Sequence, residues 1–393
     1  MANWTRSFTG SGRLLLPEPY DGPTPWTITV QDGTVVGVGA GTSQEVAGDV
    51  VDLGDALVTP GLVDAHTHPV YAGDRSDEAA ARLAGEPYTG GGILRTVAVT
   101  RETADGELEA LVRARLEAQL AGGTTTVECK SGYGLDTHEE LRHLRLVTRV
   151  AAELPLRVVR TFLGAHAIPP NTFDYVDRVV DEMLPAVAAE GLAEFCDVFC
   201  DDGFFSVPDA DRILSAAAAH GLGLRLHADQ LSRIGAVPLG VRLQATSIDH
   251  LEQLAGDDIR TIAASASVAT LLPGPALVMR DRLPPARDLL DAGATVALAS
   301  DANAGTFGSW GSMPLVIGLG ATVLGMTVAE AVAAATVGGA AALGVSSTTG
   351  RIAPGSHADL VAWDAAHEGA FALGLGGVVP RTVIVGGEVV SGP

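Results

Sequence analysis

The sequence predicts an α/β protein built on a closed parallel (β/α)8 barrel, a TIM barrel, with a small composite β-sandwich formed by the N- and C-terminal segments. Three observations lead to this prediction. From residue 58 onward, short runs rich in Val, Leu and Ala alternate with longer amphipathic stretches. Eight such strand-then-helix units occur, the number that closes a barrel. Both ends of the chain instead carry short β-like pieces between turn signals.

The predicted barrel strands are short and apolar. They are Leu62–His68, Thr124–Lys130, Leu156–His166, Phe195–Asp202, Gly223–Asp229, Ser247–Glu252, Ser267–Pro273 and Thr295–Asn303. An open doubly wound sheet is the alternative for alternating strands and helices. The count of eight units favours the barrel, as does the lack of a Gly-x-Gly-x-x-Gly turn after any strand.

Amphipathic segments between these strands are predicted as helices. They include Glu107–Ala121, His138–Ala152, Tyr175–Ala189, Asp209–His220, Asp257–Ala264 and Pro285–Ala292. Several end at a glycine (Gly122, Gly191, Gly221 and Gly293), which is the residue that most readily terminates a helix.

The two ends of the chain share short β-like pieces. These are Trp26–Val30, Thr34–Val38, Asp359–Trp363, Thr382–Val385 and Glu388–Val390. Neither end has enough apolar area to fold alone. We therefore expect residues 1–57 and 354–393 to form one composite β-sandwich domain beside a catalytic barrel of residues 58–353.

Bulk composition limits the kinds of partner. The 393 residues are 47% hydrophobic and 18% charged, which is typical of a compact protein with much buried structure. The formal net charge of −22 disfavours nucleic acid and anionic membranes. An anionic substrate would need a local cationic pocket, yet Lys130 is the only lysine in the chain.

The sequence also bears on location and redox state. No apolar run approaches the roughly 20 residues needed to cross a bilayer. The segment Met1–Arg6 lacks the layout of a secretion signal, so we expect a cytoplasmic protein. Cys129, Cys196 and Cys200 lie in apolar segments and are expected to be buried free thiols.

The most informative motif is Val63-Asp64-Ala65-His66-Thr67-His68. It follows Thr59-Pro60-Gly61 and places two imidazoles at positions i and i+2. Alternate side chains of a strand point to the same face, so His66 and His68 should project together. Two such imidazoles supply two of the three protein ligands that a catalytic zinc-type site commonly uses.

Polar residues with suitable chemistry recur at the C-terminal ends of the other predicted strands, where barrel enzymes place their functional groups. They are Lys130 to Gly134, His166, His227 to Gln230, Asp249-His250 and Asp301 to Asn303. Of ten histidines, five fall at predicted strand ends when His66 and His68 of the first strand are included. A metal ion with its supporting groups explains such a gathering better than five unrelated structural histidines.

The residue types suggest roles. We assign His66, His68 and His227 as nitrogen ligands and Asp301 as the carboxylate nearest the metal. A divalent ion lowers the pKa of its bound water to about 7, which yields metal-bound hydroxide. Asp301 would act as general base and then general acid, and His250 would hydrogen-bond the oxyanion.

A single metal is favoured over two. A two-metal site in a barrel of this kind often uses a modified lysine on the fourth strand, and that strand ends Phe199-Cys200-Asp201-Asp202. Cys200 or Asp201 is the alternative extra ligand.

At these residues the sequence resembles the amidohydrolase superfamily. The superfamily pattern is Thr59 to His68, His227, His250 and Asp301. Rarer strings resemble its imidazolonepropionase branch, which acts in histidine degradation. These strings are Gly73-Asp74-Arg75, Gly90-Gly91-Gly92-Ile93, Glu128 to Leu135, Thr161 to Pro170, Phe195 to Cys200, Leu226 to Gln230 and Ser247 to Glu252. The similarity covers nearly the whole chain.

The resemblance implies hydrolysis of the cyclic amide 4-imidazolone-5-propanoate to N-formimidoyl-L-glutamate, with one zinc or iron ion and a homodimeric protein. By position, it implies that Arg75 and Tyr133 bind the propanoate tail. It further implies ring contacts from His166 and Gln230, and a pocket lined by Asn303, Gly305 and Thr306. Arg75 agrees with the need for a local cation, because a guanidinium offers a fork to a carboxylate.

Two other functions remain as alternatives. A mononuclear amidohydrolase deaminase would act on a small heterocyclic base, but such enzymes generally use a glutamate where this chain has Gln230, and a neutral amide cannot protonate a ring nitrogen. A catalytically silent barrel is the second, since fold alone never proves activity. Between Arg75 and Gly90 the chain is shorter than the resemblance leads one to expect, so a lid over the substrate would differ there.

Overall fold

A computed structural model describes residues 4–16, 18–41, 48–85 and 91–391. Its centre is one eight-stranded sheet in the order β13-β12-β11-β10-β9-β8-β7-β6, in which all neighbours pair in parallel. The strands are β6 Leu62–Asp64, β7 Thr124–Lys130, β8 Arg157–Ala165, β9 Phe195–Cys200, β10 Gly223–Ala228, β11 Ser247–His250, β12 Val268–Leu271 and β13 Val296–Leu298. This sequential order confirms the predicted barrel.

The first and last strands meet beyond their regular ends. Thr67 and Ala302 form an isolated parallel bridge. The Asp301 N–H donates to the His66 carbonyl at 2.9 Å, and the His68 N–H donates to the Ala302 carbonyl at 2.9 Å. β6 is therefore shorter than the predicted Leu62–His68 strand, because its continuation is shared irregularly between two neighbours. This closure places His66, His68 and Asp301 side by side.

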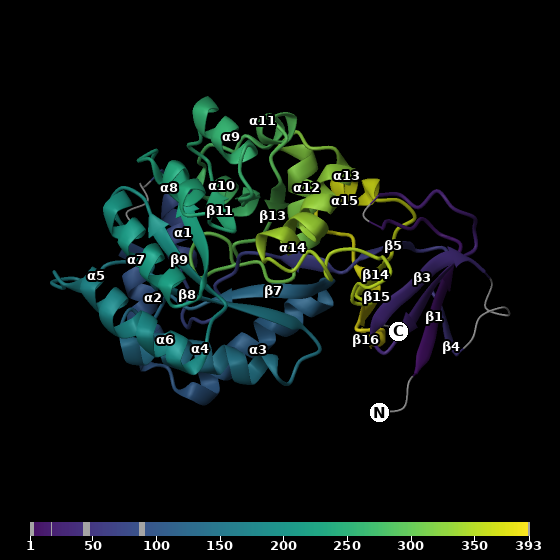
Figure 1. Cartoon of the computed structure of the whole chain (residues 1–393), viewed down its shortest axis with the longest axis horizontal. Helices are drawn as coiled ribbons and strands as arrows, with labels where there is room; N and C mark the ends of the chain where they lie inside the picture. The colour runs from purple at the N-terminus through teal and green to yellow at the C-terminus, as the bar shows by residue number, and fades with distance from the viewer. Residues whose placement is uncertain (1–3, 17, 42–47, 86–90, 392–393) are drawn as a thin grey trace.

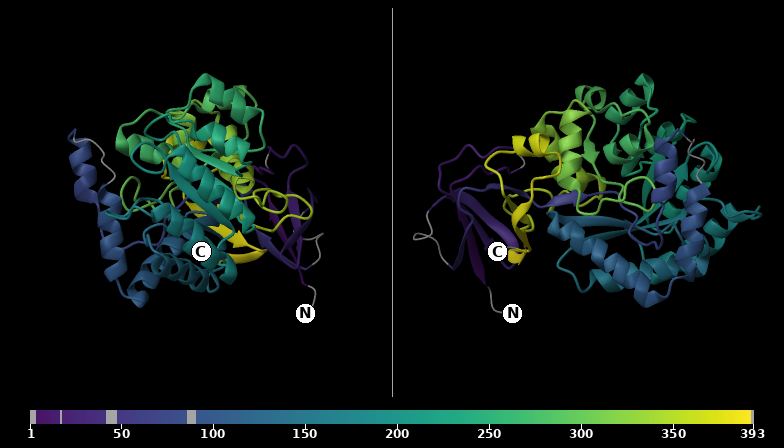
Figure 2. Two further views of the ribbon diagram at one scale, coloured as in Figure 1. Left: turned by 60° about the vertical axis from the view of Figure 1, so that its left-hand side comes forward. Right: turned by 180° about the vertical axis from the view of Figure 1, so that it is seen from behind.

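Helices cover the outside of the barrel (Figures 1 and 2). They are α1 Ser76–Leu83, α2 Gly91–Glu102, α3 Asp105–Ala121, α4 Thr137–Ala151, α5 Tyr175–Arg178, α6 Leu184–Glu190, α7 Val207–Ala219, α8 Ala236–Arg242, α9 Gly256–Ala263, α10 Pro273–Met279, α11 Ala286–Asp291, α12 Met313–Thr322, α13 Val328–Ala333, α14 Gly339–Ala342 and α15 Gly369–Gly374. Two π-helical turns, η1 Val179–Met183 and η2 Ala334–Gly338, join α5 to α6 and α13 to α14. The helix predicted over Tyr175–Ala189 is thus interrupted by η1.

Glycines terminate helices much as the sequence predicts. Gly191, Gly221 and Gly293 have φ of 61°, 81° and 84°, in the left-handed region that glycine tolerates best. After α3 the left-handed residue is Gly123, with φ of 88°, whereas Gly122 has φ of −79°.

The two ends of the chain form two four-stranded sheets beside the barrel (Figure 1). One has the order β3-β2-β1-β4, from β1 Thr5–Gly10, β2 Trp26–Gln31, β3 Thr34–Ala40 and β4 Asp49–Asp52. The other has the order β16-β15-β14-β5, from β5 Leu57–Pro60, β14 Leu360–Trp363, β15 Pro380–Val385 and β16 Glu388–Ser391. Phe8, Trp26 and Ile28 share one buried cluster with Leu360 and Ile384. The ends therefore pair as expected.

The barrel interior changes character along its axis. Near the strand starts an apolar cluster that includes Val63, Val159, Phe195 and Val268 fills the barrel. Charged side chains occupy the level above it, and the histidines lie beyond them at the strand ends. The apolar cluster thus lies at the end of the barrel away from the histidines.

Two further expectations from the sequence concern membrane-spanning helices and the segment between Arg75 and Gly90. No helix in the described part of the chain has both the length and the apolar character that a membrane crossing requires. Of the segment expected to form a shortened lid, residues 86–90 lie outside the described residues.

Candidate functional site

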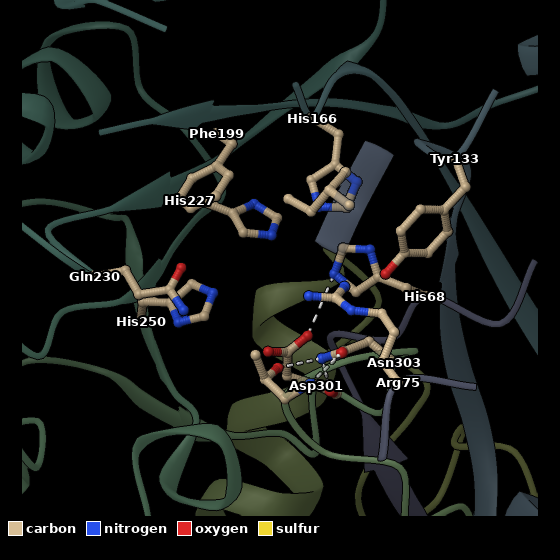
Figure 3. Close-up of a pocket in the computed structure, with 12 residues that line it drawn as sticks. His68, Arg75, Tyr133, His166, Phe199, His227, Gln230, His250, Asp301 and Asn303 are labelled. Atoms are coloured by element: carbon tan, nitrogen blue, oxygen red, sulfur yellow. Dashed lines mark hydrogen bonds and ion pairs between the residues drawn. The ribbon is translucent and has the colours of Figure 1, made fainter. Parts of the chain in front are cut away.

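A pocket opens at the C-terminal ends of the barrel strands. The residues that line it are His68, Arg75, Ile93, Tyr133, His166, Phe199, His227, Gln230, His250, Asp301, Asn303 and Thr306. Figure 3 shows the labelled side chains surrounding one common space. Two residues predicted for the site lie just outside: His66 is fully buried and packs against His68 and His227, and Gly305 lines an adjoining pocket.

One close group of donor atoms comes from the junction of the first and eighth strands. Asp301 Oδ1 lies 3.3 Å from His68 Nε2 and 3.7 Å from His66 Nε2. The two Nε2 atoms are 3.3 Å apart. The left-handed backbone of Asp301, with φ of 49°, turns its side chain toward the histidines. His66, His227 and His250 form a second close group of donors that shares His66.

These atoms fit a metal ion. His66 Nδ1 lies 2.7 Å from Asp249 Oδ2, which fixes the proton on Nδ1 and leaves the Nε2 lone pair facing the cluster. His227 Nδ1 has a carboxylate contact of its own, with Asp197 Oδ2 at 3.0 Å. His66 belongs to both donor groups, one with His68 and Asp301 and one with His227 and His250, and a divalent cation satisfies lone pairs and carboxylate oxygens of this kind.

Buried charges support both orienting carboxylates. The Lys130 ammonium lies 2.8 Å from Glu128 Oε1 and 2.8 Å from Asp197 Oδ2. The Arg225 guanidinium donates to Asp249 Oδ2 at 2.9 Å. All five side chains are fully buried. The only lysine of the chain therefore serves the layer beneath the pocket, and Arg75 is the cationic side chain among those that line it.

The surroundings set the protonation states. Burial, followed by the charge of Lys130, lowers the pKa of His66 well below its usual value. Burial also lowers the pKa of His227, although Asp197 partly offsets it. Burial alone would raise the pKa of Asp301, but the imidazoles of His68, His250 and His227 outweigh it and hold the pKa below the usual value. Neutral imidazoles and an ionised carboxylate are the forms that bind metal ions.

The pKa of His250 shifts in the opposite direction to those of His66 and His227. Burial alone would lower its pKa, but the Glu252 carboxylate, 3.5 Å from His250 Nδ1, outweighs burial and raises it. Left-handed backbone at His250 and Leu251, with φ of 81° and 72°, turns the chain at this strand end. The Glu252 carboxylate therefore favours the charged form of His250, which lines the pocket.

Aromatic rings form one wall of the pocket, next to His68. His166 stacks on His68 with ring centroids 5.1 Å apart and planes inclined by 24°, and Tyr133 meets His166 edge-on at 5.1 Å. His166 Nδ1 lies 2.9 Å from the Gly132 carbonyl, which can only accept a hydrogen bond. Nδ1 is therefore the protonated nitrogen, and Nε2 is an acceptor.

Asn303 holds its own loop together. Its Nδ2 donates to the Asp301 carbonyl and to Thr306 Oγ1, both at 2.6 Å. Its Oδ1 accepts from the N–H groups of Gly305 and Thr306 at 2.7 and 2.8 Å. These contacts use all the hydrogen-bonding capacity of the amide. Asn303 thus shapes the loop after Asp301 while lining the pocket.

Sequence reasoning placed Lys130 and Asp249 at strand ends but did not identify Glu128, Asp197 and Arg225, which complete the charged layer beneath the histidines. A signal was present, because ionisable residues stand two positions apart in buried strands. Glu128 and Lys130 do so on β7, and Arg225 precedes His227 by two on β10. Period-two spacing places such pairs on the inner face of the barrel.

Comparisons with known proteins agree with this geometry. The amidohydrolase family model matches residues 57–390. An imidazolonepropionase from Sphingopyxis alaskensis is 44% identical over 348 residues, which cover 86% of each chain. One from Pseudomonas putida is 44% identical over 351 residues, 87% of each chain. One from Rubrobacter xylanophilus is 47% identical over 337 residues, 84% of this chain and 80% of the relative.

Solved structures share the fold at low sequence identity. 5-Methylcytosine deaminase from Klebsiella pneumoniae, liganded with phosphonocytosine, superposes with a TM-score of 0.78 at 16% identity and 98% coverage of both chains. N-isopropylammelide isopropylaminohydrolase from Burkholderia multivorans gives 0.75 at 20% identity, also with 98% coverage of both chains.

Proposed function

The chain belongs to the amidohydrolase family and, within it, to the imidazolonepropionases; from this membership we propose that it hydrolyses 4-imidazolone-5-propanoate to N-formimidoyl-L-glutamate. The reaction adds water across the ring amide and breaks its C–N bond. Relatives that match along four fifths or more of their length support this proposal.

One structural observation carries the proposal. The donor group of His66, His68 and Asp301 lies beside a pocket that also contains the buried Arg75 guanidinium. Lewis-acid hydrolysis requires the donor group, and a substrate with a carboxylate tail requires a fixed cation. Although the protein carries a formal net charge of −22, the Arg75 guanidinium gives the pocket a local positive charge that can bind an anionic cyclic amide.

We assign His66, His68, His227 and Asp301 as the groups that hold one zinc or iron ion. Nitrogen and carboxylate oxygen ligands suit both metals. When bound, a divalent ion supplies Lewis-acid chemistry, in that it acidifies water and polarises a carbonyl.

The proton transfers fall to Asp301. Its ionised carboxylate takes a proton from the attacking water and delivers it to the ring nitrogen as the C–N bond breaks. His250 Nδ1 lies 3.5 Å from Glu252 Oε1, and a ring N–H of His250 donates a hydrogen bond to the carbonyl oxygen as that oxygen becomes negative. Loss of one such donor typically costs about 3 kcal/mol of transition-state stabilisation.

The remaining lining residues recognise the substrate. Arg75 and Tyr133 bind the propanoate tail. The acceptor Nε2 of His166 receives a ring N–H, and Gln230 holds the other ring nitrogen. Gly305 and Thr306, in the loop that Asn303 shapes, complete the wall.

The second candidate is a deaminase acting on a small heterocyclic base, because solved structures with this fold include such enzymes. Gln230 disfavours it, since its amide cannot deliver a proton to a ring nitrogen. Its amide nitrogen points to Met279 Sδ at 3.8 Å, which is a weak contact.

The test is direct. Purified protein is added to 4-imidazolone-5-propanoate generated from urocanate, and the loss of imidazolone absorbance is followed. We expect rapid loss together with formation of N-formimidoyl-L-glutamate. Ammonia release from cytosine or guanine, with no loss of imidazolone, would overturn the proposal.

We propose three further properties of the whole protein. Residues 1–57 with 354–393 form one composite domain and residues 58–353 the other, which the shared core of the terminal sheets supports. A homodimer and a cytoplasmic location stay predictions from the sequence.

A further inference from the structure

Arg75 is held by a carboxylate from its own segment. Glu78 lies in the first turn of α1, and its Oε2 accepts from Arg75 Nε at 2.9 Å while its Oε1 accepts from Arg75 Nη2 at 2.7 Å. Two parallel bonds of this kind fix the plane of a guanidinium as well as its position. The Arg75 side chain is 3% exposed and that of Glu78 is 24% exposed, so solvent screens the pair only in part.

A second arginine ties this pair to the catalytic loop. Arg82 Nη1 donates to Glu78 Oε1 at 3.2 Å, and Arg82 Nη2 donates to the Gly305 carbonyl. Gly305 lies in the loop that follows Asp301 and that Asn303 shapes. Glu78 is therefore bound by two guanidiniums, one lining the pocket and one anchored to the loop beside it.

Two glycines enclose the pair. A methyl group on Gly92 would overlap Glu78 Oε2 and Arg75 Nη2, and one on Gly305 would overlap Arg75 Cζ and Nη1. Neither glycine has φ in the left-handed region, so room, and not backbone conformation, requires glycine here. The ion pair is packed between two stretches of backbone.

We propose that Glu78 is a positioning residue that determines specificity for a carboxylate-bearing substrate. It holds the Arg75 guanidinium by the Nε–Nη2 edge, so that the group presents one orientation to the pocket before substrate arrives. This proposal rests on the proposed function, in which Arg75 binds the propanoate tail. An arginine that is already ordered loses less rotamer freedom on binding, which is worth about 10- to 30-fold in affinity.

The opposite role is that Glu78 competes with the substrate for Arg75. The two roles predict opposite changes in KM. If Glu78 positions Arg75, then Glu78→Gln raises KM; if Glu78 competes, then the same change lowers KM.

The experiment measures kcat and KM of the metal-loaded enzyme with 4-imidazolone-5-propanoate. We expect Glu78→Gln to raise KM about 10- to 30-fold with kcat within about twofold, since the lost interaction orders a binding group. In an Arg75→Ala background, which itself raises KM, Glu78→Gln should add less than about twofold. With 4-imidazolone, which lacks the carboxylate tail, kcat/KM should be unaffected by Glu78→Gln.

The matched control is Asp77→Asn, on the same helix. Asp77 is 66% exposed on its side chain and pairs with the exposed Arg95, so KM should stay at the wild-type value. Gly92→Ala is a second variant, independent of the Glu78 charge, and should raise KM in the same way by displacing the pair.

The outcomes separate the two proposals. If the wild type does not hydrolyse the substrate, the proposed function is overturned. If Arg75→Ala leaves KM unchanged, the assignment of Arg75 to the propanoate tail is overturned. In either case the positioning role of Glu78 is overturned as well. If Arg75→Ala raises KM but Glu78→Gln and Gly92→Ala do not, only the positioning role is overturned. A lower KM for Glu78→Gln also overturns it.

Discussion

Replacing the single lysine should destabilise the protein strongly. The Lys130 ammonium contacts Glu128 and Asp197 at 2.8 Å each, and all three side chains are fully buried. Burial alone would lower the pKa of Lys130, but the two carboxylates outweigh burial and raise it. The group is therefore a cation at neutral pH.

Lys130→Met keeps the length of the side chain and removes its charge. The change leaves two buried carboxylates without their nearest cation, and Arg225 is 3.9 Å from Glu128. Removing one partner of a buried ion pair typically costs about 3–5 kcal/mol. Because folded domains are stable by only about 5–15 kcal/mol, we expect a large loss.

The assay is urea unfolding of metal-free protein, followed by far-ultraviolet circular dichroism. Arg95→Met is the matched control, because Arg95 is 51% exposed and pairs with Asp77 at 2.8 Å. An exposed pair of this kind contributes at most about 1 kcal/mol. Adding Glu128→Gln to Lys130→Met removes one uncompensated charge and should recover part of the loss. A Lys130→Met protein as stable as the Arg95→Met protein would refute the reasoning.

Three other predictions concern catalysis and stability. Asp301→Asn should fold normally and lower kcat about 100- to 10,000-fold, because proton transfer is lost; more than a tenth of wild-type turnover would contradict its role. Dialysis against a strong chelator should abolish imidazolone hydrolysis, and added zinc or ferrous ion should restore it; full activity in metal-free protein would exclude metal catalysis. Burial lowers the pKa of His143 from 6.5 to about 3. As the pH falls, the His143 imidazole is therefore protonated in the unfolded chain before it is protonated in the folded protein, and the free energy of unfolding decreases from about pH 7 downward. That loss is about 2 kcal/mol at pH 5 from this group, and His143→Leu should remove it from the measured pH dependence of unfolding.

The gathering of histidines at one end of the barrel could be predicted from the sequence. The C-terminal ends of parallel strands in a closed barrel all face the same way, so residues such as His66, His227 and Asp301 must approach one another once the strands are recognised. The pattern of apolar runs and intervening helices was sufficient for that. The resemblance to the amidohydrolase superfamily supplied the pocket residues that no spacing rule identifies, such as Arg75.

The contacts that orient these groups could not be predicted. Asp249 meets His66 across 183 positions of sequence, and the pairing depends on where the last strands close against the first. The link from Arg82 to Gly305 spans 223 positions for the same reason. Lys130 looked like a scarce cation for an anionic substrate, yet strand register places it against Asp197. Such pairings depend on tertiary arrangement, which local patterns do not encode.

The most direct test of the proposed metal site is an anomalous-difference map from crystals of the metal-loaded protein. We expect one peak at the strand ends, with His66, His68 and His227 nitrogens about 2.0–2.1 Å away and an Asp301 oxygen at about 2.0–2.2 Å. His250 should stand off the peak, facing the pocket. A map with no peak there, or with His250 bound in place of His68, would contradict the assignment on which the proposed chemistry depends.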